Sequence, residues 1–172
     1  MNNQPTPARI ALKWGLFLGV ALIIYSLFLY LTDNVGNSKL GWVSFALSIV
    51  GLVLAMRDYR TLNGGFMTYG EGLTIGTLTA GVSGLLSSLF SVFYTTVVDA
   101  GVMTRMVEKT REQLEDSGVS DEQIDQQIKF VEMFQSPGLL FLFGVIGAII
   151  SGLLLSLIIA AIVRRNKANP FE

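Results

Sequence analysis

The sequence predicts an all-α integral membrane protein with four transmembrane helices and a helical hairpin between the third and the fourth. Four long apolar segments carry this prediction, because a helix needs roughly 20 apolar residues to cross the hydrocarbon core of a bilayer. Only 15% of the 172 residues are charged, against roughly 25% in an ordinary soluble domain. The one long polar segment lies between the last two apolar segments. We therefore expect residues 1–172 to form a single membrane domain.

The composition excludes several kinds of chemistry. The sequence contains no cysteine and no histidine, the residues that supply most zinc ligands, thiol nucleophiles and general bases. No run of basic residues resembles a nucleic-acid-binding face. We therefore expect no metal site, no cofactor and no nucleic acid, and the first expected partner is the lipid bilayer.

The first span is predicted at residues 12–31 and the second at residues 40–56. Basic residues flank the start of the first span, as in a signal peptide. Its apolar core is about 20 residues long, however, and no A-x-A cleavage site follows it, so we interpret it as a retained span. The second span is the shortest, with Trp42 as an interfacial anchor. The charged segment 57–60 is expected to close it.

The third span is predicted at residues 72–98, directly after a helix start signal. Thr68 and Glu71 have the spacing of a capping box, in which each side chain accepts a hydrogen bond from a backbone N–H at the helix start. We interpret Glu71 first as a member of this capping box. The alternative is a polar site on the cytoplasmic side, made by Glu71 with Tyr69, Arg57 and Arg60.

The fourth span, at residues 138–163, shares a feature with the third. In both spans every fourth residue is small, so one ridge of each helix carries almost no side-chain volume. Membrane helices associate by close packing, which small residues four apart allow. We predict that the two ridges pack on each other or across a subunit boundary, and a substrate cavity is the alternative. The ridge residues are Gly72, Gly76, Ala80, Gly84 and Ser88 in the third span, and Gly144, Ala148, Gly152, Ser156 and Ala160 in the fourth.

Residues 99–136 are polar and are expected to form an extramembrane helical hairpin. Asp99 is placed to cap the first helix, Gly118 suits the left-handed position after it, and Ser120 with Gln123 forms the capping box of the second helix. We interpret the acidic face of this hairpin as a solvated surface, with a cation or partner site as the alternative. For Asp99, the alternative to capping is membership of a polar site.

The basic residues predict that both termini lie in the cytoplasm. Lys and Arg close to span ends mark the cytoplasmic side of a membrane protein. On the side of the termini all of them lie close to span ends: Arg9, Lys13, Arg57, Arg60, Arg164, Arg165 and Lys167. On the other side several lie within the polar segment instead: Lys39, Arg105, Lys109, Arg111 and Lys129. We expect a multi-pass protein of the inner membrane with its hairpin outside.

Several short motifs together resemble one membrane family of bacteria. They are Tyr69-Gly70-Glu71-Gly72 at the start of the third span, Val98-Asp99 at its end, Gly118-x-Ser120-x-Glu122-Gln123-Ile124 in the hairpin, and Leu157-Ile158-x-Ala160-Ala161-Ile162 before the basic tail. Over nearly its whole length the chain resembles the family catalogued as domain of unknown function 4199. It departs from that family at Ala100, where the family has proline. The resemblance implies a four-span protein with no assigned activity.

The expected function is that of a non-enzymatic scaffold or accessory protein, acting through helix packing and its external hairpin. The alternative is a small transporter or channel subunit whose pore forms on oligomerisation, because one four-helix bundle leaves little room for a polar path. The expected protein partner is accordingly a second copy of the chain or another membrane protein. An intramembrane enzyme is disfavoured, because no base stands beside the serines at 87, 88, 91 and 151 in the sequence.

Overall fold

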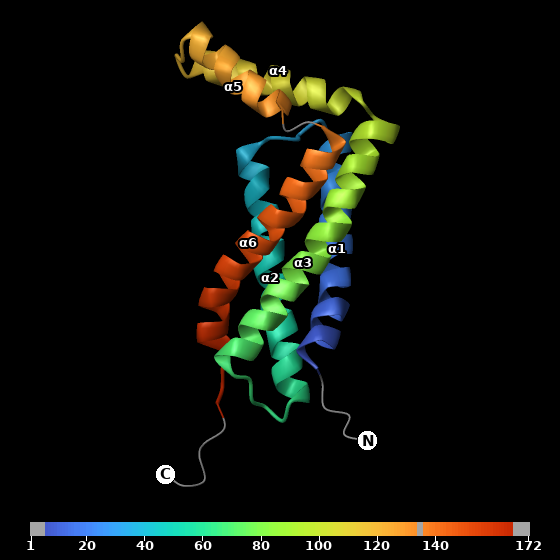
Figure 1. Cartoon of the computed structure of the whole chain (residues 1–172), viewed down its shortest axis with the longest axis vertical. Coiled ribbons are helices and arrows are strands. Elements are labelled where there is room, and N and C mark those ends of the chain that lie inside the picture. Colours follow the sequence, from blue (N-terminus) through green and yellow to red (C-terminus); the bar gives the residue numbers. More distant parts are fainter. Residues whose placement is uncertain (1–5, 134–135, 167–172) are drawn as a thin grey trace.

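The computed structural model describes residues 6–133 and 136–166, and almost all of them are helical (Figure 1). Four helical stretches are long and apolar enough to cross a membrane, namely α1, α2, α3 with η1, and α6. The predicted all-α membrane fold with four spans is confirmed. The elements are α1 (Pro7–Leu31), α2 (Ser38–Leu62), α3 (Tyr69–Phe93), the π-helical turn η1 (Tyr94–Val98), α4 (Gly101–Asp116), α5 (Asp121–Met133) and α6 (Pro137–Val163).

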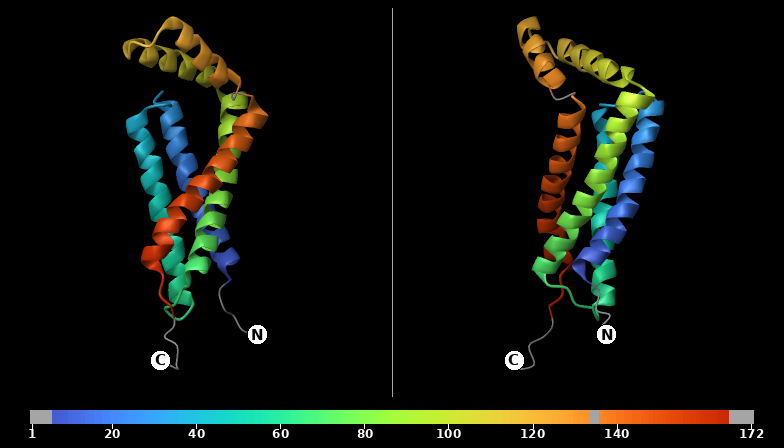
Figure 2. Two further views of the ribbon diagram at one scale, coloured as in Figure 1. Left: turned by 60° about the vertical axis from the view of Figure 1, so that its left-hand side comes forward. Right: turned by 45° about the vertical axis from the view of Figure 1, so that its right-hand side comes forward.

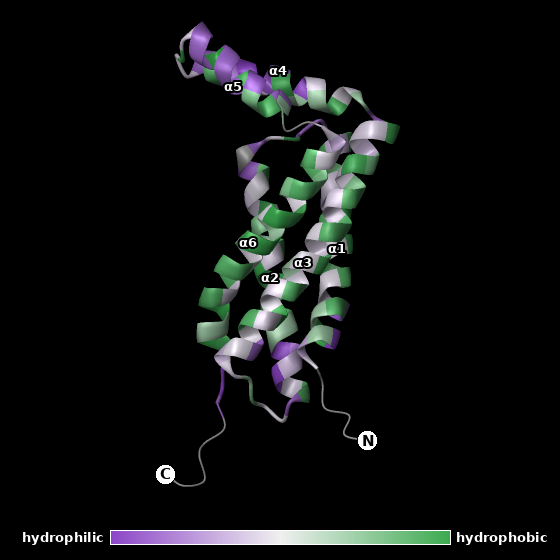
Figure 3. Ribbon diagram, in the orientation of Figure 1, coloured by the Kyte–Doolittle hydropathy of each residue, from purple (hydrophilic) through white to green (hydrophobic). Residues whose placement is uncertain are grey.

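The four long helices form a bundle in which α1 begins and α6 ends at the same end (Figure 1). We call this the termini end, and we call the opposite end, which α4 and α5 cross, the hairpin end. α3 packs along both α6 and α1. Figure 2 shows the hairpin lying across the bundle from two further directions, and Figure 3 shows that the spans are mainly hydrophobic while hydrophilic residues gather in the hairpin.

Local signals determine where the spans begin. Thr6 accepts a hydrogen bond from Arg9 N at the start of α1, and Asn37 accepts one from Lys39 N at the start of α2. Both hydrogen bonds of the predicted capping box are present between Thr68 and Glu71, at the start of α3. These side chains satisfy backbone N–H groups that have no partner within the helix.

α2 extends beyond the predicted second span. It continues to Leu62, so the charged segment 57–60 lies inside the helix and does not close it. Asp58 in this segment accepts hydrogen bonds from Lys13 Nζ and Trp14 Nε1 of α1, each at 2.8 Å. The helix continues past the predicted span because a neighbouring helix satisfies the polar side chain of Asp58.

The third span ends in the π-helical turn η1, which the sequence did not predict. Tyr94 in this turn is buried, and its ring stacks on that of Tyr30 in α1 with the centroids 4.3 Å apart. The hydroxyl oxygens of Tyr30 and Ser91 share a hydrogen bond of 2.7 Å. π turns occur mostly as single insertions and frequently at functional sites. These contacts fix α1 against the corner where α3 passes into α4.

α4 and α5 form the predicted hairpin. Gly118 has a φ of 74°, and Val119 N donates a hydrogen bond to the Leu114 carbonyl, as the expected left-handed helix end requires. Ile124 and Ile128 of α5 are buried where α5 packs on α4. The hairpin therefore has a small apolar interior of its own.

Candidate functional site

The interface between α3 and α6 contains every residue of the two predicted ridges. In each contact one partner is a glycine and the other is an alanine or a serine, and the two helices run in opposite directions. The pairs are Gly72 with Ala160, Gly76 with Ser156, Ala80 with Gly152, Gly84 with Ala148, and Ser88 with Gly144. A side chain on any of these glycines would collide with its partner: a Cβ at Gly72 would lie 2.8 Å from the Cβ of Ala160.

These contacts lie within one chain, so the ridges are already occupied before any second subunit binds. α1 packs closely on α3 in the same way, through two glycines four residues apart. Gly15 lies against Val82, and Gly19 lies against Leu86. Lipid tails are as apolar as the side chains of a span, so burying apolar surface between two helices gains little free energy. Close packing of the backbones is therefore a main source of helix association in membranes. α3 is therefore the central helix, fixed between α1 and α6.

At the termini end, Glu71 has a partner that the sequence did not predict. Its Oε1 accepts a hydrogen bond of 2.7 Å from the hydroxyl of Tyr59, a buried residue of α2, while its Oε2 accepts one from the backbone N of Thr68. Tyr69 donates instead to the Leu157 carbonyl of α6 at 3.4 Å. Glu71 thus joins α2 to the start of α3.

One basic member of the predicted polar site binds another helix. Arg60 Nη1 donates to the Val163 carbonyl at the end of α6, at 2.9 Å. Arg57 is exposed on α2. Polar side chains at the termini end therefore connect neighbouring helices by hydrogen bonds. Glu71 caps α3 and accepts a hydrogen bond from Tyr59.

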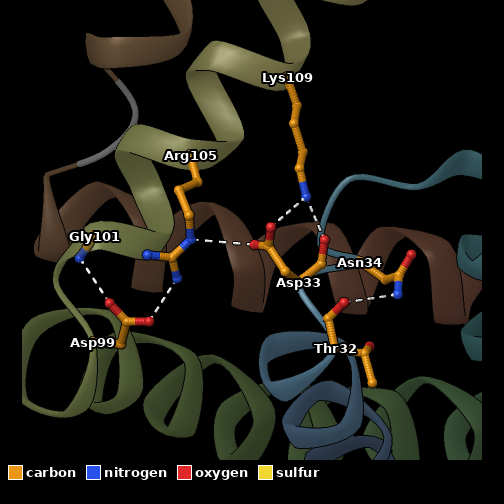
Figure 4. A network of polar contacts seen from close by, with 7 residues as sticks. All are labelled: Thr32, Asp33, Asn34, Asp99, Gly101, Arg105 and Lys109. Atoms are coloured by element: carbon orange, nitrogen blue, oxygen red, sulfur yellow. Dashed lines mark hydrogen bonds and ion pairs between the residues drawn. The ribbon is translucent and has the colours of Figure 1, made fainter.

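At the hairpin end, Asp33 and Asp99 hold the start of α4 against the bundle (Figure 4). Asp99 Oδ1 accepts from Gly101 N at 3.0 Å, and its Oδ2 accepts from Arg105 Nη2 at 2.6 Å. Arg105 Nε also donates to Asp33 Oδ1 at 3.2 Å. Lys109 Nζ donates to both Oδ2 and the backbone carbonyl of Asp33. We call these four charged residues the hairpin latch.

Opposite charge lowers the pKa of both carboxylates in the hairpin latch. For Asp33 the hydrogen bond from Lys109 is the largest cause, and Arg105 adds to it. For Asp99 the hydrogen bond from Arg105 is the largest cause, and the backbone N–H of Gly101 adds to it. Asp99 raises the pKa of the Arg105 guanidinium in return. Both carboxylates are therefore ionised throughout the physiological pH range.

Sequence reasoning found only part of the hairpin latch. Asp99 does bind the first backbone N–H of α4, as capping predicts, although Ala100 is the residue at the geometric N-cap. Asp33 lies in a turn between α1 and α2, and nothing in the sequence places that turn beside α4. The usable signal was the spacing of Arg105 and Lys109, which puts two basic side chains on one face of α4.

The bundle is closed at the termini end and hollow in its hairpin half. Its buried apolar core gathers near the termini end and includes Met56, Ile75 and Ile159. In contrast, none of residues 39–50 of α2 is buried. A crevice of about 340 Å³ lies between α2, α3 and α6 in this half, with Leu18 of α1 among the residues behind it.

Hydroxyl groups line this crevice from three helices. Ser83 and Ser87 of α3 line it and are four residues apart, so they share one face of the helix. Thr79 continues this face by one turn toward the termini end. The other hydroxyl-bearing residues of the lining are Ser44 and Ser48 of α2 and Ser151 of α6. Among the lining residues none is charged, so the crevice suits an uncharged group.

The crevice provides shape and hydrogen-bond acceptors. Within residues 6–133 and 136–166, no cluster of three or more carboxylate, thiol or imidazole side chains could hold a metal ion. Ser48, Ser83 and Ser87 donate their hydroxyl hydrogens to carbonyls of their own helices. Their oxygens keep lone pairs that can accept hydrogen bonds from a ligand.

A family model described as "Protein of unknown function (DUF4199)" matches residues 13–165 of the chain. No curated protein and no solved structure matches the chain significantly. The matched residues include all four spans except the first turns of α1, together with the hairpin. The chain belongs to the DUF4199 family of proteins of unknown function.

Proposed function

We propose that the protein is a non-enzymatic scaffold or accessory protein of the inner membrane, which binds a membrane-protein partner through its extramembrane hairpin. The observation that supports this most is the hairpin latch. A hairpin attached only by its two chain connections would change its orientation freely. Arg105 and Lys109 bind Asp33 in the connection between α1 and α2 and so hold α4 in one orientation.

The charge of the hairpin favours a partner with a basic surface. Its exposed charged residues are mostly acidic, and opposite charge on a partner guides binding and sets its orientation. The exposed acidic residues are Glu108, Glu112, Glu115 and Asp116 of α4 and Asp121, Glu122, Asp125 and Glu132 of α5.

We place the termini end in the cytoplasm and the hairpin outside, because basic residues follow the cytoplasmic ends of spans. Because the sequence contains no cysteine, a single introduced cysteine shows on which side of the membrane it lies, without background labelling of other thiols. Ser117→Cys at the hairpin tip should react with an impermeant maleimide in intact cells, whereas Thr61→Cys near the termini end should react only after permeabilisation. The reverse pattern would invert the orientation.

Site-specific photocrosslinking tests the scaffold role. A photoreactive residue in place of Glu112 should give one discrete adduct with a second membrane protein, identified by mass spectrometry. The control position is Phe17, which is 62% exposed on α1. Recovery of the uncrosslinked monomer alone from Glu112, or the same products from both positions, would remove the proposal.

A small transporter or channel subunit is a second candidate, and the crevice is the observation that favours it. A bundle that is open toward one end and closed by an apolar core at the other has the form of one state of an alternating-access carrier. Reconstitution into liposomes tests this function. Solute or ion flux that depends on the protein and is lost in Ser151→Phe would support it, and no flux above empty liposomes would exclude it.

A further inference from the structure

The crevice in the hairpin half combines three features that together describe a ligand site. It is a cavity of about 340 Å³, within the usual size range of roughly 300–1,000 Å³ for small-molecule pockets. It is lined by leucines and by hydroxyl groups, and it lies within the spans. A ligand can therefore enter it from the bilayer without first crossing water.

The charge of the lining selects among bilayer molecules. No residue of the lining is charged, and a charged headgroup without a counter-charge is costly inside a membrane. Ser48, Ser83 and Ser87 donate their hydroxyl hydrogens to carbonyls of their own helices, so their oxygens are available only as acceptors. The ligand that complements them is uncharged and brings its own O–H donor.

The lateral edge of the crevice is open to lipid. Phe45 of α2 is 42% exposed, and Ser151 of α6 is exposed. Gly147 lies beside Ser151 in the lining, and a Cβ added there would meet no atom within 4 Å. Leu18, Leu52 and Leu155 provide the apolar wall against which an alkyl chain can lie.

We propose that the crevice between α2, α3 and α6 binds a neutral, hydroxyl-bearing lipid of the diacylglycerol type. Its hydroxyl group donates to the serine oxygens of α3, and its alkyl chain packs against the leucines. This binding is independent of the scaffold role of the hairpin, and it holds whether or not the chain moves the lipid across the membrane.

Photolabelling of the purified full-length protein in nanodiscs tests the proposal. The probe is a diacylglycerol with a diazirine on its acyl chain, and labelled residues are mapped by mass spectrometry. Labels should fall on the lining residues of α2 and α6. An excess of unlabelled diacylglycerol should remove most of the label, whereas an equal excess of phosphatidylglycerol should not.

Two variants and a matched control separate the site from general lipid contact. Ser151→Phe fills the crevice mouth and should reduce labelling at least tenfold. Ser87→Ala removes a hydroxyl group from the lining, so it should weaken labelling while leaving the melting temperature nearly unchanged. Thr74→Leu makes a comparable polar-to-apolar change at an exposed position of α3 and should leave labelling unchanged.

Three results would overturn the proposal. The first is labelling spread evenly over lipid-facing residues and insensitive to Ser151→Phe. The second is equal competition by phosphatidylglycerol, which would mean that the crevice does not select an uncharged ligand. The third is crosslinking of the crevice residues to a second copy of the chain, which would assign the crevice to a dimer interface.

Discussion

The carboxylate of Asp33 lies 3.2 Å from the Nε of Arg105, although 72 positions separate the two residues in the chain. Together with Lys109, this contact attaches the hairpin to the connection between α1 and α2. Its residues are partly exposed, so each ion pair is weak by itself. Its importance is geometric, because it determines where the hairpin lies.

Removing the carboxylate should release the hairpin without unfolding the bundle. Asp33→Asn loses the charge that binds Arg105 and Lys109, so hydrogen exchange should accelerate in α4 and α5 and stay unchanged in α3 and α6. Asp116→Asn, at the exposed tip of the hairpin, is the matched control and should leave exchange unaltered. Equal exchange in wild type and Asp33→Asn would show that the latch does not hold the hairpin.

The same ion pairs predict the effect of pH. The folded protein lowers the pKa of Asp33 and Asp99, so their stabilising contribution is fully present above the unfolded pKa of about 4. It is lost as the pH falls through the lowered folded values. Hydrogen exchange of the hairpin, measured between pH 7 and pH 3 and corrected for the intrinsic rate, should therefore increase only below about pH 4. In the double variant Asp33→Asn/Asp99→Asn this pH dependence should disappear, and its persistence would assign it to other groups.

The glycines of α6 should respond oppositely to alanine according to the face on which they lie. A Cβ at Gly152 would collide with Ala80, whereas a Cβ at Gly147 would meet nothing within 4 Å. Gly152→Ala should cost about 1–3 kcal/mol through overpacking. Gly147→Ala should instead gain about 0.5–1 kcal/mol, because alanine loses less backbone entropy in a helix. Unfolding in detergent measures both, and an equal response of the two variants would contradict the packing.

Tyr59 should matter more than another tyrosine with a similar hydrogen bond. Tyr59→Phe removes a donor to the Glu71 carboxylate, and hydrogen bonds to charged groups contribute about 1.5–3 kcal/mol. Tyr25→Phe removes a donor to the neutral Leu40 carbonyl, and its cost should be nearer 1 kcal/mol. Thermal unfolding measures which variant loses more stability. A larger loss of stability in Tyr25→Phe would show that the hydrogen bond between Tyr59 and Glu71 contributes little.

The sequence was sufficient for features that depend on local periodicity. The four-residue spacing of small residues predicted both ridges, and the cap at Thr68 and the turn at Gly118 follow from rules that span only a few positions. The pairing of Gly76 with Ser156 needed the structure, because periodicity does not say which helix a ridge will meet. From the sequence alone, packing across a subunit boundary therefore stays an alternative.

Features that depend on long-range contacts could not be predicted in this way. The predicted second span ends at residue 56 because charged residues usually mark a membrane boundary, whereas the helix continues to Leu62 and α1 satisfies Asp58. A cavity was the alternative interpretation of the ridges, but its serine lining could not be predicted, because serines in a span also bond to their own helix, as Ser83 and Ser87 do. These serines line a crevice only because α2 lies apart from α3 and α6 in the hairpin half of the bundle.

Disulfide formation between α3 and α6 tests the central claim that the two small ridges pack within one chain. A Cβ at Gly144 would lie 3.2 Å from the Cβ of Ser88, close to the separation of about 3.5–4.5 Å in disulfides. In this cysteine-free chain, Ser88→Cys/Gly144→Cys should form a disulfide within the monomer. Ser88→Cys/Ser156→Cys, displaced by about 18 Å along α6, should form none. Disulfides that appear only between two copies, or that form equally in both variants, would contradict the account.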